Sequence, residues 1–230
     1  MDKSAAGFNL ESKKNMTKII GIIQVKGGAG RSTVATNIAG VMAQASRTVL
    51  IDCDMPQGTS ASWYSIRKQT GKAQGLTLAT ATNHTELVQQ VEQHSDSDLI
   101  IIDCPPRIAE ITRAALILCD LCLVPIGASA AEIWATSDLL KTIEEAKQIK
   151  PGVDARLVWN RFRSATSSAQ ELTTAVREGL GLAEMKTKLA LRVAYSDALA
   201  RGLTVTEWPE KAAREEMIEL TKEVSKILKL

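Results

Sequence analysis

The chain has 230 residues, of which 45% are hydrophobic and only 3% aromatic, and its formal net charge is +2. A chain of this size can bury one aliphatic core, and its charge excludes a polycation that binds nucleic acid over its whole surface. No apolar run approaches the ~20 residues of a membrane span. The four cysteines, without an apolar export segment, indicate thiols in the cytoplasm.

Residues 1–17 are polar and weakly patterned, and we expect a flexible tail, or a start-site extension, ahead of a single domain over 18–230. Within that domain, strand-like apolar runs alternate with helical stretches. The runs cover 19–25, 48–52, 76–80, 99–103, 121–126 and 155–160. This alternation predicts an α/β fold with a mainly parallel, twisted sheet and helices on both faces.

A glycine-rich loop directly follows the first run and reads Lys-Gly-Gly-Ala-Gly-Arg-Ser-Thr from Lys26 to Thr33. Its glycines leave consecutive backbone N–H groups free to surround phosphate oxygens, and the helix that opens near Arg31 directs its positive end at the same anion. We therefore predict a nucleotide site, with the Ser32 hydroxyl on Mg²⁺. The expected nucleotide-binding residues are Gly27, Gly28, Ala29, Gly30, Arg31, Ser32 and Thr33.

Two later runs end in carboxylates. Asp52 and Asp54 close the run at 48–52, and Asp103 closes the run at 99–103. Open α/β sheets place their ligands at the carboxyl ends of the strands, and phosphoryl transfer relies on metal-holding and water-orienting carboxylates. We expect Asp103 to hold Mg²⁺ through water. For Asp52 and Asp54, capping of the following helix is the alternative interpretation.

The loop resembles the deviant Walker A motif of the ParA and MinD group of ATPases, which has a lysine at its head. The segment from Asp52 to Gly58 resembles that group's Asp-x-Asp-Pro-Gln-Gly, with Met55 as an insertion. The resemblance extends from about Lys18 to the C-terminus. It implies a P-loop NTPase of the deviant Walker A type that binds ATP and Mg²⁺, in the small ParA form without an N-terminal helix-turn-helix.

The resemblance also implies roles for single residues. Lys26 would reach the partner's nucleotide in an ATP-dependent homodimer, Asp52 would lie near the Mg²⁺ shell, and Asp54 would orient the attacking water. Asn160 would read the adenine, although an asparagine here is also a common turn former. Arg31 replaces the usual lysine, and its planar guanidinium has a different reach. We expect bidentate phosphate contact but slow or absent intrinsic hydrolysis, which Arg31→Lys should raise.

A function follows from the same resemblance. The chain would be a nucleoid-associated switch that binds DNA non-specifically and partitions or positions a plasmid or other cargo, with a partner protein that stimulates hydrolysis or links the cargo. A transfer-associated role like that of VirC is also open. The basic residues expected on DNA are Lys186, Lys188, Arg192 and Arg201. For each of them, a solvated basic face is the alternative.

Three other classes remain as alternatives. Cys119 and Cys122 form a Cys-x-x-Cys, which an iron–sulfur or metal carrier of this fold would need, but their apolar run favours buried hydrophobes. The last helix, over 209–230, has an apolar stripe that a membrane-positioning ATPase like MinD would insert. Its interleaved glutamates favour packing against the sheet instead, so we expect no membrane partner. The third class is a nucleotide-binding protein without catalysis.

Overall fold

The computed structural model describes residues 16–107, 109–127, 130–163 and 179–230, together with 171, 173, 174 and 176. Within these residues, seven strands form one sheet in the order β3-β2-β4-β1-β5-β6-β7, and every pairing is parallel. The strands are β1 Lys18–Ile22, β2 Thr48–Asp52, β3 Leu76–Thr80, β4 Leu99–Asp103, β5 Leu121–Ile126, β6 Asp154–Trp159 and β7 Ala183–Glu184.

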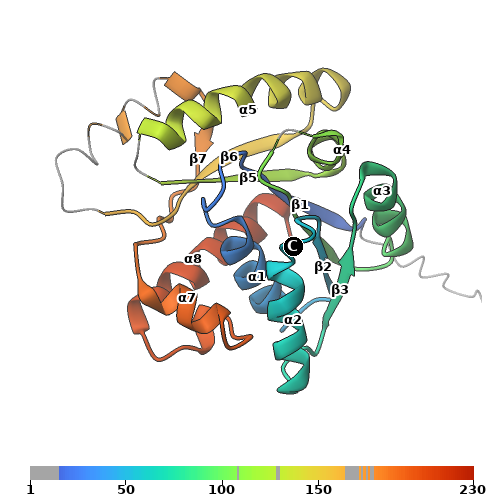
Figure 1. The fold of residues 1–230 in the computed structure, drawn as a ribbon, viewed down its shortest axis with the longest axis vertical. Helices are drawn as coiled ribbons and strands as arrows, with labels where there is room; N and C mark the ends of the chain where they lie inside the picture. The colour runs from blue at the N-terminus through green and yellow to red at the C-terminus, as the bar shows by residue number, and fades with distance from the viewer. Residues whose placement is uncertain are drawn as a thin grey trace, which may run out of the picture.

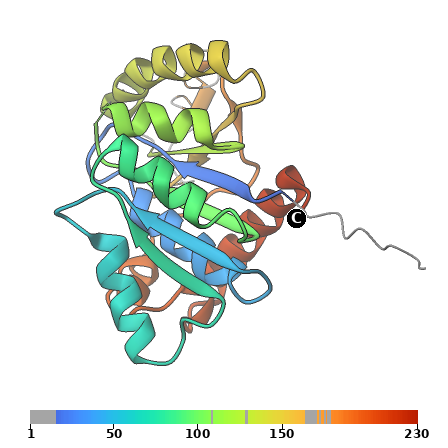
Figure 2. The same ribbon diagram turned by 90° about the vertical axis from the view of Figure 1, so that its right-hand side faces the viewer.

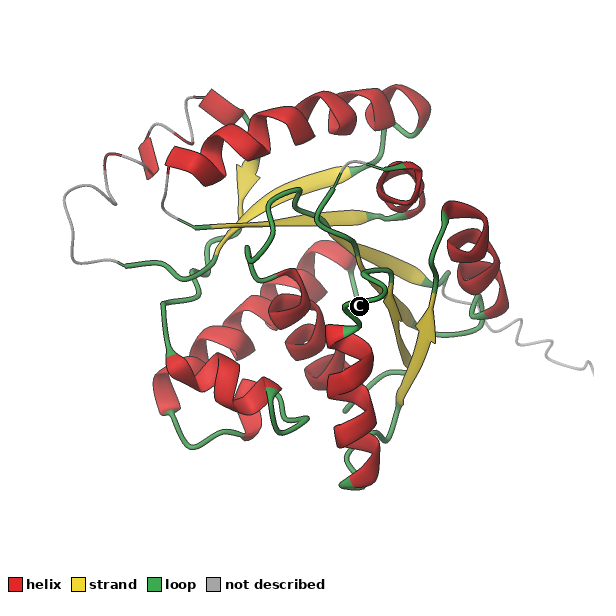
Figure 3. Ribbon diagram, viewed as in Figure 1, coloured by secondary structure: helices red, strands yellow, loops and turns green. Residues whose placement is uncertain are grey.

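Helices cover both faces of this sheet, which confirms the predicted α/β fold (Figures 1 and 3). The helices α3, α4 and α5 lie together along one face, as Figure 2 shows from the side, and α1, α2, α7 and α8 cover the other. They are α1 Arg31–Met42, α2 Thr59–Gln69, α3 His84–Gln93, α4 Glu110–Leu118, α5 Ala130–Ile149, α7 Val193–Leu199 and α8 Lys211–Leu228, with the 3₁₀ turn η1 Val205–Glu207.

The central strands are buried on both sides, because each face of the sheet meets its own helical layer. All five residues of β4 are fully buried, and its four apolar residues, 99–102, alternate between the two hydrophobic cores. The apolar runs of the sequence therefore match β2, β3, β4 and β5 residue for residue. The first run is longer than β1, since 23–25 already lead into the loop, and the two-residue β7 was not predicted.

The C-terminal helix α8 packs with its apolar stripe against α1 and the sheet. Ala213, Met217, Leu220 and Val224 are fully buried in the same core as Ile38 of α1. The predicted packing of this helix is thus confirmed, and the stripe is not available for insertion into a lipid surface. No helix in the described ranges combines the length and the hydropathy needed to cross a membrane.

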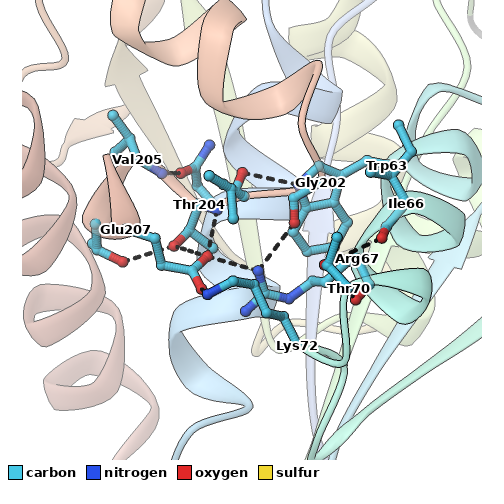
Figure 4. A network of polar contacts seen from close by, with 12 residues as sticks. Trp63, Ile66, Arg67, Thr70, Lys72, Gly202, Thr204, Val205 and Glu207 are labelled. Carbon is cyan, nitrogen blue, oxygen red and sulfur yellow. Dashed lines mark hydrogen bonds and ion pairs between the residues drawn. The ribbon is translucent and has the colours of Figure 1, made fainter. Parts of the chain in front are cut away.

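A polar network joins α2 to the segment that leads from α7 into η1 (Figure 4). The Arg67 guanidinium donates to the Gly202 carbonyl at 3.1 Å and to a Glu207 carboxylate oxygen at 2.7 Å. Nearby, the Trp63 indole N–H donates to the Leu203 carbonyl at 3.0 Å. The α1 helix holds the same segment, since the Val205 N–H donates to the Asn37 side-chain oxygen. Both α1 and α2 therefore end against one C-terminal segment.

Candidate nucleotide-binding site

The parallel order of the sheet brings the glycine-rich loop and the motif acids to one edge. In the sheet register, Asp103 at the end of β4 lies opposite Ile22 of β1 on one side and Asp52 of β2 on the other. The loop leaves β1, and α1 and α2 begin at the same edge. The structure therefore brings together the loop residues and all three predicted acids, as ligand sites of open α/β sheets require.

The base of the loop is anchored by Gln24, which the sequence analysis did not single out. Its fully buried amide donates to the Pro125 carbonyl at 3.1 Å and to the Thr136 hydroxyl at 3.0 Å, and its side-chain oxygen accepts from the Val25 N–H. A buried amide with partners on β5 and α5 fixes the loop relative to both elements. Only its position directly after a buried strand hints at this role.

The glycines of the loop differ in what a side chain at their position would meet. An added Cβ on Gly27 or Gly28 would meet nothing within 4 Å, so these two leave open space above their backbone. Gly30 has φ +93°, and a Cβ there would lie 2.0 Å from the Asn160 side-chain nitrogen. That nitrogen donates to the Ala29 carbonyl at 2.8 Å, and Asn160 is 4% exposed. The structure thus places Asn160 against the loop, whereas its predicted contact with adenine stays a prediction.

Asp103 has the properties expected of a metal-holding acid. One of its oxygens accepts from the Ser60 hydroxyl at 2.7 Å, while the other is buried without a partner among the described residues. Complete burial raises the pKa of Asp103 to about 7, although the neighbouring Ser32 and Ser60 hydroxyls lower it. A buried, unpartnered carboxylate oxygen beside the loop fits an ordered Mg²⁺ or its water, because an orphan oxygen here costs free energy otherwise.

The described residues contain no group of three or more His, Cys, Asp or Glu side chains able to hold a metal ion alone. Mg²⁺ is usually held by one or two carboxylates together with phosphates and water. Cys119 and Cys122 are fully buried free thiols, as the apolar run predicted, and burial also raises the pKa of the Cys53 and Cys104 thiols.

The other two acids are placed differently. Both carboxylate oxygens of Asp52 accept backbone N–H groups, from Asp54 at 3.0 Å and from Ala61 at 2.8 Å. Asp52 therefore holds the first turn of α2, which is the capping alternative; its place near the Mg²⁺ shell stays a prediction. Burial raises the pKa of Asp52. Asp54 is only partly buried, and its carboxylate pairs with Arg31 at 3.4 Å.

Arg31 turns inward from the start of α1 and is 6% exposed. Its Nε donates to the Cys104 carbonyl at 2.8 Å, and its Nη1 donates to the carbonyls of Gln24 at 2.7 Å and Lys26 at 2.8 Å. The predicted bidentate contact of Arg31 with phosphate stays a prediction. Lys26, at the head of the loop, is partly buried, and Ser32 and Thr33 lie half-buried in the first turn of α1.

The four basic residues expected on DNA fall on the C-terminal part of the fold, but they are not equivalent. Lys186 and Arg201 are exposed. The Lys188 ammonium lies 4.2 Å from the centre of the Phe162 ring. Arg192 forms 2.8 Å ion pairs with Glu210 and with Glu216. Its charge is thus largely neutralised within the protein.

Three further cations, missed in the sequence, surround Lys186. Arg156, Lys222 and Lys226 line the same cavity of about 510 Å³ between β6 and α8, together with Glu219 and Glu223. Their positions in the sequence gave no signal, because β6 and the end of α8 meet only in the fold. They extend the basic surface on one side of Lys186, although the two glutamates offset part of the charge.

Comparison with known proteins agrees with this site. The family model described as ATPase MipZ matches residues 18–206. The maintenance of carboxysome distribution protein A of Halothiobacillus neapolitanus is 30% identical over 193 residues, which cover 83% of this chain and 88% of that protein. The chromosome-partitioning ATPase Soj of Thermus thermophilus is 25% identical over 220 residues, covering 82% and 87% of the two chains.

Solved structures show the same fold. The ATP complex of McdA from Cyanothece aligns with a TM-score of 0.74 at 16% identity, covering 91% of this chain and 96% of that one. The septum site-determining protein MinD of Pyrococcus horikoshii, solved with Mg-ADP, aligns with a TM-score of 0.70 at 16% identity, covering 92% and 97%. Nucleotide therefore occupies proteins of this fold in both structures.

Proposed function

Because the chain belongs to the MipZ family, within the ParA and MinD group of deviant Walker A ATPases, we propose that it is an ATP-dependent switch that dimerises, binds DNA non-specifically and positions a cargo. The observation that carries the proposal is the buried oxygen of Asp103, unpartnered among the described residues and next to the glycine-rich loop. A buried acid in that place is suited to a magnesium nucleotide.

Each residue of the site has a part in this proposal. The backbone N–H groups of the loop surround the phosphates, and Ser32 with Asp103 holds Mg²⁺, which would neutralise phosphate charge when bound. Asp54 orients the water that attacks the terminal phosphate. Such chemistry needs positioned charges more than covalent steps, so small displacements of Asp54 change turnover strongly.

Dimerisation is supported by large apolar side chains that are exposed to solvent near the loop. Trp134 on α5 is 72% exposed, and Val193 and Leu191 at the start of α7 are 71% and 48% exposed. In Figure 1 the beginnings of α5 and α7 flank the side of the sheet where the loop leaves β1. Exposed apolar patches of this kind are typical of surfaces that a partner covers. We propose a second copy as that partner, with Lys26 reaching across.

DNA binding is assigned to the C-terminal basic surface, defined here as Lys186, Lys188, Arg201, Lys222 and Lys226. The net charge of +2 gives little attraction over the whole molecule, so binding depends on this local surface. A dimer presents it twice, and the contacts of the two copies add on one DNA molecule. ATP would therefore raise DNA affinity, because the ATP-bound dimer presents two copies of the basic surface where a monomer presents one.

The cargo is proposed from the relatives. The matched proteins are named for maintenance of carboxysome distribution and for chromosome partitioning, and both names describe the placement of a large object in the cell. We propose the same class of task for this chain, with a partner protein that links the cargo and stimulates hydrolysis.

The test is DNA binding measured with ATP, with ADP and without nucleotide, over a series of salt concentrations. We expect binding only with ATP, and a plot of log K against log salt whose slope becomes shallower by about 0.9 for each phosphate contact removed by Lys186→Gln. The matched control is Lys68→Gln, at an exposed lysine on α2. DNA binding that ignores the nucleotide would contradict the proposal, as would equal slopes for Lys186→Gln and the unmodified chain.

A further inference from the structure

The guanidinium of Arg31 is at the centre of the site, and its surroundings are mainly backbone carbonyls. The acceptors come from three places: Gln24 after β1, Lys26 in the loop and Cys104 after β4. A fourth contact reaches the Asp54 carboxylate. Arg31 therefore joins the two strand ends on either side of the nucleotide loop to the acid expected to orient water.

Most of the N–H groups of the Arg31 guanidinium are already bonded within the protein, which leaves few for a phosphate. A guanidinium has five N–H groups, one on Nε and two on each terminal nitrogen. Nε is used by Cys104, both N–H groups of Nη1 by the two loop carbonyls, and one of Nη2 by Asp54. Among the described contacts, a single N–H of Nη2 is left. A bidentate phosphate contact would require the guanidinium to abandon buried carbonyls, each at a desolvation cost.

From this geometry we infer that Arg31 is a positioning residue, a clamp that fixes the loop backbone and holds Asp54, and that it is not the principal phosphate ligand. The inference rests on the proposed nucleotide binding and deepens it. Phosphate recognition then falls to the loop N–H groups and the start of α1. Slow hydrolysis would follow from the ion pair, because an Asp54 oxygen that Arg31 holds is less available to orient water.

A lysine could not make the same set of contacts. Its three N–H groups radiate from one nitrogen, whereas the fork of Arg31 spans from the Cys104 carbonyl on Nε to Asp54 on Nη2. A lysine at this position would supply a compact positive charge for phosphate, whereas Arg31 instead connects several parts of the protein through its hydrogen bonds. Asn160 supports the same loop from the other side through the Ala29 carbonyl, so the loop is held at both flanks.

The direct test follows the Arg31 Nε–H by nitrogen-15 NMR of arginine side chains, with the signal assigned by its loss in Arg31→Lys. The clamp predicts a slowly exchanging Nε–H, because it is buried and bonded to a carbonyl, and predicts that the signal keeps its shift and slow exchange in MgADP. A signal that moves and exchanges rapidly once MgADP is added would overturn the inference, since the guanidinium would then have left Cys104.

A second test uses Arg31→Met and Asp54→Asn, alone and together. The clamp predicts that MgADP affinity falls less than about tenfold in Arg31→Met, and that the losses in stability of the nucleotide-free variants are not additive, since the two residues share one contact. A larger loss of affinity with additive stabilities would identify a phosphate ligand. Gly40→Ala is the control, because Gly40 touches Thr204 and Trp63 far from the loop and its variant shows what general destabilisation does to affinity.

The two proposals fail in different ways. If the unmodified chain binds no MgADP, the proposed function is wrong, while the stability coupling between Arg31 and Asp54 still decides the clamp. If MgADP binds and the coupling is absent, the clamp is wrong and the proposed function stands.

Discussion

Two buried arginines lie at opposite ends of the α1 and α2 pair, and they are held differently. Arg31 is 6% exposed at the nucleotide loop, and Arg67 is 4% exposed near the end of α2. Arg31 donates to three backbone carbonyls and Arg67 to one, and each also donates to one carboxylate. The ion pair is 2.7 Å for Arg67 with Glu207 but 3.4 Å for Arg31 with Asp54. The short Arg67–Glu207 pair lies away from the predicted nucleotide site, and the longer Arg31–Asp54 pair lies within it.

The carboxylates differ even more than the arginines. Glu207 also accepts from the Thr204 N–H and hydroxyl and from Lys72, and Arg67 stacks on Trp63 at 5.2 Å. In Figure 4 these side chains converge on one point between α2 and the C-terminal segment. The Arg67 Nε is buried without a partner among the described residues, but a pair with this many bonds is harder to separate than a pair with one long contact. The far end of α2 is therefore held more tightly than the near end.

Removal of Arg67 should have the largest effect. Arg67→Met leaves Glu207, whose side chain is 19% exposed, without its main partner and the Gly202 carbonyl without that donor, so we expect a loss of about 2 to 4 kcal/mol in the free energy of unfolding. Arg31→Met removes the donor of the Gln24, Lys26 and Cys104 carbonyls but lets the partly buried Asp54 turn to solvent, so we expect a smaller loss of about 1 to 3 kcal/mol. Urea unfolding of both variants measures this. Equal losses would show that the two sites are held alike.

The stability that the Glu207 carboxylate contributes should depend on pH. Burial alone would raise its pKa, but hydrogen bonds from Arg67 and from the Thr204 backbone hold the pKa at about 2. A depressed pKa gives stability that is full above the unfolded pKa, near 4.5, and that is lost as pH falls toward 2. Glu207→Gln should therefore cost roughly 1.5 to 3 kcal/mol at neutral pH, and its deficit should shrink below about pH 4.5.

Urea titrations of the unmodified chain and of Glu207→Gln at several pH values between neutral and about pH 3 check this prediction. A deficit that stays constant over the range would mean that the charge of Glu207 does not contribute. Asp154→Asn is the comparison variant, because Asp154 also pairs with an arginine, Arg156, but is 37% exposed and should contribute less.

Gly40 tests the close approach of α1 to the same C-terminal segment. A Cβ on Gly40 would lie 2.3 Å from the Thr204 methyl carbon and 3.3 Å from the Trp63 ring. Gly40→Ala should cost about 1 to 3 kcal/mol by overpacking, and Thr204→Ser should restore most of it in the double variant by removing that methyl. Thermal unfolding compares the variants. If Thr204→Ser does not restore the stability of the Gly40→Ala variant, the contact with the Thr204 methyl is not the cause of its loss of stability.

Local patterns in the sequence were enough to predict the sheet and the acids of the site. The unbroken apolar runs of β2 and β4 give the strands, and an acid directly after each run gives Asp52 and Asp103 at the ligand edge. These patterns involve residues that are adjacent in the sequence, so they can be recognised without a structure. Ser60, which bonds Asp103 from α2, has no such signal, since only the packing of α2 brings its hydroxyl there.

The contacts of the two arginines could not be predicted from local patterns, because their partners are distant in the sequence. The acceptors of Arg31 at Cys104 and Asp54 are 73 and 23 residues away, and Arg67 meets Glu207 across 140 residues. A buried guanidinium takes whatever oxygens the fold places within reach, so the sequence motif predicted Arg31 as a phosphate contact and gave no role to Arg67. Distant partners decide the task of a charged residue once it is buried.

Arg192 extends the comparison to the proposed DNA surface, where we expect the smallest effect. Its two ion pairs with Glu210 and Glu216 resemble the tight pairing of Arg67, and the hydrogen bonds that it donates to Glu216 raise its pKa. Arg192→Gln should therefore leave the salt slope of ATP-dependent DNA binding unchanged, while Arg201→Gln makes it shallower by about 0.9. Because the guanidinium is 28% exposed, the cost in stability should stay near 1 kcal/mol. A reduced slope for Arg192→Gln would mean that DNA phosphates displace the glutamates, and that even a doubly paired arginine can exchange its partners.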